Sequence, residues 1–228
     1  MGFCSRSQAA ALIRDGRVKL NGLIIRDPEN PVRIGRDRVE VDGTLIAELP
    51  KVYLVMNKPR GVVTTACDEK GRKTVYDLLG PSLPWVGPVG RLDKASEGLL
   101  LLTNDSEWAA KITDPATHLD KTYHVQVDQV ADDSLLAKMT RGTTVDGDHL
   151  QVKAARVLRR GEKHSWLEIT LDEGKYRQIR RLLAALDVEV LRLVRVAVGP
   201  LELGDLKKGA VRELELREKQ AIDRGLRG

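Results

Sequence analysis

The sequence has few aromatic residues, few cysteines and no apolar run long enough to cross a bilayer. Only 4% of its 228 residues are Phe, Tyr or Trp, so few side chains are available to stack on a flat ligand. No apolar stretch approaches the roughly 20 residues that a membrane-spanning helix needs. The first residues, MGFCSRSQAA, lack the apolar region of a signal peptide. We therefore expect a cytoplasmic protein that does not contact a membrane.

Metal-binding and disulfide patterns are also missing. The two cysteines, Cys4 and Cys67, are too few for a disulfide framework and do not form the close pairs of a zinc site. The histidines show no ligand spacing (His118, His124, His149 and His164). We therefore expect neither a metal nor another cofactor, and a monomer is the default oligomeric state.

Positive charge is in modest excess and is unevenly distributed. The net charge is +5 and the pI is near 9.2. Residues 6–26 carry one acid, Asp15, against five cations (Arg6, Arg14, Arg17, Lys19 and Arg26). Residues 175–181 carry no acid and four cations (Lys175, Arg177, Arg180 and Arg181). Such clusters indicate contact surfaces for a polyanion, although solvated helix faces would give the same pattern.

A small α+β unit is predicted at the N-terminus. Ser5 to Gln8 form a capping box that begins a helix, and Gly16 ends it. Residues 17–20 alternate as a strand, and Asn21-Gly22 predicts a hairpin turn. A further strand pair is expected around Val32 and at residues 39–41. Residues 47–51 are the predicted junction, which gives one unit over 1–47 and another over 51–228.

The second unit mixes strands and helices without regular alternation, which favours an α+β fold over a doubly wound sheet. The predicted strands cover residues 53–56, 99–102, 122–127, 154–158 and 165–171. The predicted helices cover residues 74–79, 106–112, 131–140 and 175–186, and a charged tail closes the chain.

One acid has unusual neighbours. In GRLDKASEGLLLLTND, residues 90–105, Asp93 lies between Arg91 and Lys94 and just ahead of the leucines at 99–102. Nearby positive charge favours an ionised carboxylate, and a buried strand would hold the preceding loop rigidly. This suits a catalytic acid, but an ordinary surface aspartate beside cations would give the same local pattern.

Several blocks together resemble one enzyme family. PVGRLDKASEGLLLLTND is similar to the signature motif of the RsuA/RluB/RluE/RluF group of pseudouridine synthases, which act on ribosomal RNA. Four further blocks resemble that family in the expected order: VMNKP at 55–59, KTYHV at 121–125, GKYRQIRR at 174–181 and GDLKKGAVREL at 204–214. The match spans roughly residues 51–220. It implies a catalytic domain with a mixed, largely antiparallel sheet, ribosomal RNA as the partner, and no cofactor.

The N-terminal unit resembles a second family. SRSQAAALIRDGRVKLNG, from Ser5 on, is similar to the S4 RNA-binding module. The helix that normally opens such a module has no counterpart here. Either the start of the chain is truncated, or this version of the module folds against the catalytic domain without its first element. The resemblance implies RNA contacts from its cations (Arg6, Arg14, Arg17 and Lys19).

The resemblance also assigns roles around the predicted catalytic acid. Asp93 acts on the sugar during N1–C1′ cleavage, either as nucleophile or as base at C2′. Arg180 is its expected ion-pair partner, and Tyr123 is expected to stack beside the uracil. The remaining candidates are RNA contacts: Arg91, which would fill the vacated base stack; Lys58, a phosphate or structural contact; and Lys175, Arg177 and Arg181, nearer the RNA backbone.

Two other functions are compatible with parts of this pattern. A non-catalytic RNA-binding protein, such as a ribosome assembly factor, could keep the same scaffold, but an intact set of Asp93, Tyr123 and Arg180 favours an enzyme. A hydrolytic nucleosidase would need a second acid or a metal to activate water, and the sequence offers no clear candidate. Neither the target uridine nor the ribosomal subunit follows from the sequence.

Overall fold

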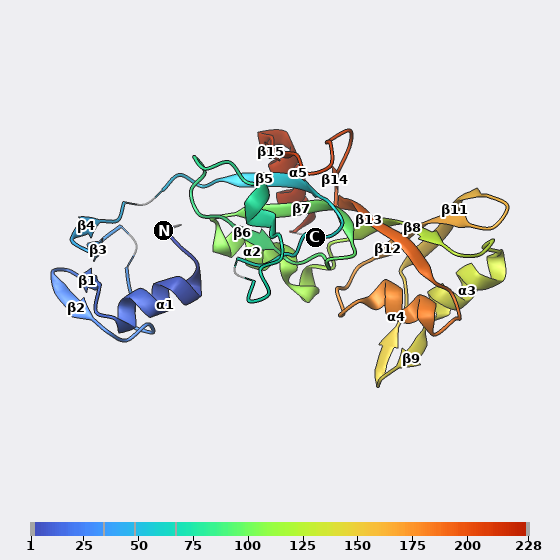
Figure 1. Ribbon diagram of the computed structural model, residues 1–228, viewed down its shortest axis with the longest axis horizontal. Helices are drawn as coiled ribbons and strands as arrows, with labels where there is room; N and C mark the ends of the chain where they lie inside the picture. Colours follow the sequence, from blue (N-terminus) through green and yellow to red (C-terminus); the bar gives the residue numbers. More distant parts are fainter. Residues whose placement is uncertain (1–2, 34, 48, 67, 227–228) are drawn as a thin grey trace.

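The computed structural model describes residues 3–33, 35–47, 49–66 and 68–226, in which a small N-terminal part is followed by a larger one (Figure 1). Cys67 and one residue of the predicted junction lie outside the described residues, and the boundary at 47–51 stays a prediction. Within these ranges, no helix is long and apolar enough to span a bilayer.

The N-terminal part consists of one helix and a small sheet. Helix α1 (Arg6–Arg14) has Ser5 as its N-cap in a capping box with Gln8, as predicted. The sheet has the order β2-β1-β3-β4 and antiparallel pairing; its strands are β1 (Val18–Leu20), β2 (Leu23–Ile25), β3 (Val39–Val41) and β4 (Thr44–Leu45). The strand expected around Val32 is wrong, because β3 pairs with β4. Pro31 has no N–H to donate to a ladder there.

The larger part is built on one mixed sheet with the order β11-β12-β8-β13-β7-β5-β15, to which β14 adds beside β13 and β6 beside β7. The pairing of β13 with β7 is parallel and the other pairings are antiparallel. This confirms the predicted fold class. The strands are β5 (Tyr53–Lys58), β6 (Gly87–Val89), β7 (Glu97–Thr103), β8 (Lys121–Val127), β11 (Ala154–Arg160), β12 (Ser165–Leu171), β13 (Val190–Val198), β14 (Leu201–Glu202) and β15 (Val211–Glu213). Strands β9 (Thr143–Val145) and β10 (Asp148–Leu150) form a separate hairpin.

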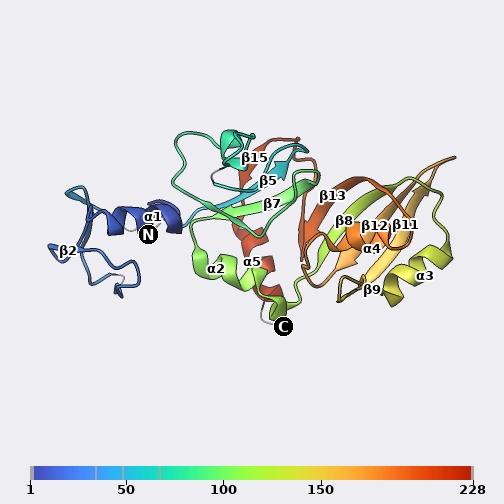
Figure 2. The same ribbon diagram turned by 60° about the horizontal axis from the view of Figure 1, so that its bottom comes forward.

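Helices cover this sheet (Figure 2). They are η1 (Val75–Leu78), α2 (Ser106–Thr113), η2 (Pro115–Thr117), α3 (Asp133–Arg141), α4 (Gln178–Ala184) and α5 (Leu216–Gly225). The side chain of Asp105 caps α2, as expected. Helix α4 is shorter than the predicted 175–186, because Arg177 adopts a left-handed conformation (φ +48°) and so begins the helix at Gln178.

The leucines of β7 are buried on both faces of the sheet. Leu99 and Leu101 pack in a cluster with residues of α2 and α5. Leu100 and Leu102 point to the other face and pack with residues such as Val75 of η1. A strand covered on both faces reads as a continuous apolar run, which explains the run noticed in the sequence. A third cluster lies between strands β8, β12 and β13 and helices α3 and α4.

The two halves of the sheet meet where β7 and β13 run parallel. Gly98 faces Arg195 there with φ +103°, and a Cβ on Gly98 would lie 2.2 Å from the Arg195 carbonyl oxygen. The neighbouring Glu97 is buried and ion-paired with Arg192 and Lys208, each at 2.7 Å. Burial alone would raise the pKa of Glu97, but the hydrogen bonds from the two cations outweigh it and lower that pKa. This seam joins β7 to β13, which in turn pairs with β8.

Candidate active site

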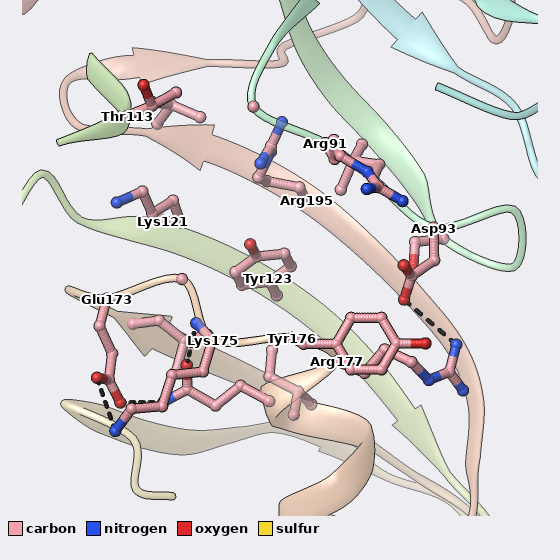
Figure 3. A pocket seen from close by; sticks show the side chains of 18 of the residues that line it. Arg91, Asp93, Thr113, Lys121, Tyr123, Glu173, Lys175, Tyr176, Arg177 and Arg195 are labelled. Atoms are coloured by element: carbon pink, nitrogen blue, oxygen red, sulfur yellow. Dashed lines mark hydrogen bonds and ion pairs between the residues drawn. The ribbon is translucent and has the colours of Figure 1, made fainter. Parts of the chain in front are cut away.

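A cavity of about 610 Å³ lies beside the seam between the two halves of the sheet. Asp93 lies at one end of it, Lys121 toward the other, and Tyr123 between them (Figure 3). Its size falls within the roughly 300–1,000 Å³ of small-molecule sites. The candidate catalytic residues from two distant parts of the sequence, Asp93 and Tyr123, thus line one cavity.

The loop that carries Asp93 is fixed by its backbone. Each of the four carbonyl groups from residue 93 to residue 96 accepts a hydrogen bond. The carbonyls of Asp93 and Ser96 accept from Lys58 Nζ, at 3.1 and 2.8 Å. The carbonyl of residue 94 accepts from the N–H of Gly61 at 2.8 Å, and that of residue 95 from Arg180 Nη2 at 3.2 Å. The loop is therefore held in position before any ligand binds.

Lys58 was predicted as an RNA contact, and the structure corrects this. Its side chain is fully buried, and its Nζ donates to the carbonyls of Pro59, Asp93 and Ser96. Burial lowers the pKa of Lys58 to about 8, against the opposing charges of Asp93 and Glu97. Lys58 cannot reach a phosphate, so of the two roles left open the structural one holds.

The carboxylate of Asp93 is paired with Arg177, and this also differs from the prediction. Arg177 Nη1 lies 3.3 Å from Asp93 Oδ2, and both side chains are about one third exposed (38% and 29%). Arg180, the expected partner, forms no ion pair with Asp93 among the described residues. The reason is the left-handed backbone of Arg177, which turns this residue out of the helix on which Arg180 lies.

Arg180 instead binds the protein backbone next to the site. Its guanidinium donates to the carbonyls of Val190 at 3.1 Å and Ala95 at 3.2 Å, while its Nε is buried with no partner among the described residues. Burial and the neighbouring Arg177 lower the pKa of Arg180, and the negative charge of Asp93 opposes them. Arg180 is a positioning residue for the loop that carries Asp93.

Tyr123 lies on β8, opposite Ile169 on one side and Arg195 on the other. Its ring is partly buried and packs against core clusters from both halves of the sheet. The ring therefore has a fixed position in the cavity. This placement agrees with a stacking role for Tyr123, which stays a prediction.

The other predicted RNA contacts fall into two groups. Arg91 is exposed and lines the cavity, and Lys175 at the cavity wall pairs with Glu173 at 3.0 Å. Arg181 is different, because it binds Asp148 at 2.8 Å and the Val145 carbonyl at 2.9 Å. Its side chain is only 18% exposed. Arg181 therefore holds the β9–β10 hairpin against α4, which corrects its prediction as an RNA contact.

In the N-terminal part, all four predicted contacts are exposed, and three of them lie on α1 or the sheet without a side-chain partner among the described residues (Arg6, Arg14 and Lys19). Arg17 is also exposed, but it forms a two-point pair with Asp42, at 2.9 and 2.5 Å. That pair ties β3 to the start of β1, so Arg17 has a structural partner that the other three cations lack in the described part of the chain.

The sequence did not predict several polar and aromatic residues of the cavity. Lys121 and Arg195 line it, and so does Tyr176, whose side chain is 72% exposed beside Arg177 (Figure 3). The alternation of β8 contained a signal for Lys121, since residues two apart on a strand share a face. The sequence contained no such signal for Arg195, because arginines are rarely buried and the surrounding pattern is apolar.

The arrangement offers one carboxylate to a ligand. Asp93 and Glu173 are the acids that line the cavity, and Glu173 is engaged by Lys175 and by Gln178 Nε2 at 2.6 Å. The described residues contain no cluster of His, Cys, Asp and Glu that could hold a metal. A single carboxylate beside an aromatic ring suits chemistry at the sugar of a nucleoside.

Comparison with known proteins assigns this fold and site to a class. The sequence profile of the RNA pseudouridylate synthase family matches residues 52–185, and that of the S4 domain matches residues 1–44. The chain therefore belongs to the RNA pseudouridylate synthase family, whose members are isomerases, and carries an S4 domain. Both predicted family resemblances are confirmed.

Individual relatives agree with this assignment. The chain is 38% identical to the ribosomal large subunit pseudouridine synthase B of Bacillus subtilis, over 97% of this chain and 91% of that one. It is 39% identical to an uncharacterized RNA pseudouridine synthase of Aquifex aeolicus, over 95% and 88%. A crystal structure of a pseudouridylate synthase superimposes with a TM-score of 0.68 at 30% identity, covering 96% of this chain and 94% of that one.

Proposed function

We propose that this enzyme isomerises a uridine of ribosomal RNA to pseudouridine, with Asp93 as its catalytic carboxylate. The observation that carries the proposal is the loop of Asp93: its backbone carbonyls are all bound, while its carboxylate faces a cavity large enough for a nucleoside. The Bacillus subtilis relative is named for the large ribosomal subunit. This supports the RNA of that subunit as the substrate.

The reaction needs one carboxylate and no added water. The N1–C1′ bond breaks, and its electron pair stays on the uracil. The base then turns, a C5–C1′ bond forms, C5 loses its proton and N1 gains one, so the product has the same atoms as the substrate. Cleavage builds positive character at C1′, as in other glycosidic reactions. Asp93 either attacks C1′ as a nucleophile or removes a proton from C2′.

The surrounding residues have separate roles in this proposal. A uridine in folded RNA must be flipped out of its stack to reach Asp93, and the ring of Tyr123 receives the flipped base. Arg177 holds the carboxylate through their ion pair. Lys58 and Arg180 keep the loop in place through its carbonyls.

Binding of the RNA around the target uses exposed groups. Arg91 and Tyr176 lie at the cavity, where a cation can meet a phosphate and an exposed ring can meet a neighbouring base. Arg6, Arg14 and Lys19 are exposed in the S4 domain and supply further phosphate contacts.

The proposal is tested by release of tritium from large-subunit ribosomal RNA labelled at C5 of uridine. The wild type releases tritium, and Asp93→Asn abolishes release while its affinity for RNA stays unchanged. Asp133→Asn is the matched control, since Asp133 is exposed on α3, and it keeps full activity. Tritium release by Asp93→Asn at the wild-type rate would exclude the mechanism. Mapping pseudouridines with and without the gene gives the target position.

A further inference from the structure

Among the cations that line the cavity, Lys121 and Arg195 lie on the strands β8 and β13 and form no ion pair with a described residue. Arg195 is only 7% exposed. Its Nε donates to the carbonyl of Leu99 at 2.7 Å, whereas its two Nη atoms bind no group among the described residues. Lys121, which is partly buried, forms no hydrogen bond or ion pair within the same part of the chain. Burial of a cation without a counter-charge is costly, so this pair points to an anionic ligand.

The register of the sheet places both cations beside Tyr123. Arg195 on β13 is the direct neighbour of Tyr123 on β8, and residues opposite each other in an antiparallel pair project to the same face. Lys121 precedes Tyr123 by two residues, which puts it on that face about 7 Å along the strand. Figure 3 shows Arg195 directly above the Tyr123 ring and Lys121 above it and to the left.

The acids around Lys121 form no ion pair with it or with Arg195 among the described residues. Asp120 is engaged by Lys153, with both carboxylate oxygens at 2.8 Å, and Glu173 is engaged by Lys175. Burial, followed by the charge of Arg195, lowers the pKa of Lys121, while Asp120 and Asp172 oppose this. Burial and the charge of Arg195 thus outweigh the two acids in their effect on the pKa of Lys121.

We propose that Lys121 and Arg195 form the site that binds the negative charge of the detached uracil at its carbonyl oxygens. This inference rests on the proposed function, in which the electron pair of the broken N1–C1′ bond stays on the base. That charge spreads over N1 and the two ring carbonyl oxygens. Cations already in position stabilise such a charge without reorganising. Both residues then touch the reacting base and are catalytic residues.

The depth of the pair favours the base over the RNA backbone. The substrate also contains phosphodiesters, but Arg195 is nearly inaccessible and lies against the ring proposed to stack on the uracil. A phosphate, which stays largely hydrated, is expected nearer the exposed Arg91. The anion that reaches Arg195 is therefore the uracil.

The test uses 5-nitrouracil, a uracil whose nitro group makes a ring N–H acidic and whose ionisation changes its ultraviolet spectrum. The full-length wild type is expected to bind the anion roughly tenfold more tightly than the neutral form, which lowers the apparent pKa of the bound ligand by about one unit. Lys121→Met is expected to remove most of that shift, and Lys121→Arg to restore it. Lys138→Met is the matched control, because Lys138 is exposed on α3, and it leaves the shift unchanged.

Three results would overturn the inference: equal affinity of the wild type for both forms of the ligand, an unchanged shift in Lys121→Met, or displacement of 5-nitrouracil by inorganic phosphate that depends on Lys121. If thermal unfolding shows that Lys121→Met is not folded, Lys121→Gln takes its place. The titration requires no isomerisation, and the tritium assay requires no 5-nitrouracil. Failure of this inference is therefore distinguishable from failure of the proposed function.

Discussion

Lys58 Nζ lies 3.1 Å from the carbonyl oxygen of Asp93 and 2.8 Å from that of Ser96. The fully buried ammonium thus bridges both ends of the loop that carries the proposed catalytic carboxylate. Lys58 belongs to one of the motifs shared with the RNA pseudouridylate synthase family, and its ammonium group binds the protein's own backbone.

Replacement of Lys58 by methionine tests this bridge. Methionine has a similar length and shape, but it donates no hydrogen bond. The variant therefore leaves the carbonyls of Pro59 and Ser96 without their donor, and the carbonyl of Asp93 keeps only the N–H of Ser96. Unsatisfied buried carbonyls lower the free energy of unfolding by about 2–4 kcal/mol in total, measurable by urea denaturation. The folded variant should also isomerise RNA more slowly. Wild-type stability in Lys58→Met would show that the bridge contributes nothing.

The stability of the protein should depend on pH through the same residue. The pKa of Lys58 is lowered from 10.5 to about 8 by burial, so between these values the unfolded chain holds a proton that the folded chain has released. Stability therefore rises with pH across this window and is level below it. The gain amounts to about 3 kcal/mol, at roughly 1.4 kcal/mol per unit. It is measured as the difference in unfolding free energy between the wild type and Lys58→Met, which cancels other titrating groups.

Replacement of Arg177 and replacement of Arg180 should differ in their effect on stability. Arg177→Gln removes the partly exposed partner of the Asp93 carboxylate, so kcat should fall about tenfold to a hundredfold with little change in the melting temperature. Arg180→Gln removes donors to Val190 and Ala95, so the melting temperature should fall as well. Calorimetry and tritium release on both variants make the comparison. A different result would favour the ion pair between Arg180 and Asp93 that the sequence predicted: Arg180→Gln loses activity at wild-type stability, whereas Arg177→Gln keeps its activity.

Gly98 should tolerate no side chain. In Gly98→Ala the new Cβ meets the carbonyl oxygen of Arg195, at a backbone conformation (φ +103°) that alanine rarely adopts. We expect a loss of about 3 kcal/mol or more, or insoluble protein. Gly80→Ala is the matched control, since nothing lies within 4 Å of its Cβ and its φ is not positive. A melting temperature of Gly98→Ala equal to that of the control would contradict the tight packing of the seam.

The S4 domain should contribute to RNA affinity through charge. Combined replacement of Arg6, Arg14 and Lys19 by alanine removes three exposed cations and leaves the Arg17–Asp42 pair intact. Each lost phosphate contact reduces the slope of log affinity against log salt by about 0.7–0.9, so the slope should fall by roughly two to three units. An unchanged slope in filter-binding assays would show that these cations do not meet the RNA.

Local patterns in the sequence were sufficient to locate several elements. The leucines at 99–102, the alternation of residues 122–127 and the capping residues Ser5 and Asp105 each predicted the element that the structure contains. These signals are short-range, because a cap or an alternating face is set by neighbours within a few residues. The motifs likewise placed Asp93 and Tyr123, which do line one cavity.

The failures come from long-range contacts. Strand β13 was not predicted, because Arg192 and Arg195 interrupt its apolar pattern; their partners, Glu97 and the Leu99 carbonyl, lie more than ninety residues away. The role of Lys58 was left open between a phosphate contact and a structural one, since an isolated sequence does not show the carbonyls that Lys58 binds. The choice between Arg177 and Arg180 depended on one left-handed residue at the start of α4, which the basic run did not reveal.

The place of β13 in the sheet has a consequence for the synthesis of the enzyme. This strand joins β8 to β7, yet residues 190–198 leave the ribosome only after most of the chain. A chain that ends before Val190 lacks Arg195, the parallel seam and the carbonyl that Arg180 binds. The active site is therefore completed only once β13 has been synthesised, because this strand supplies Arg195 and one side of the seam.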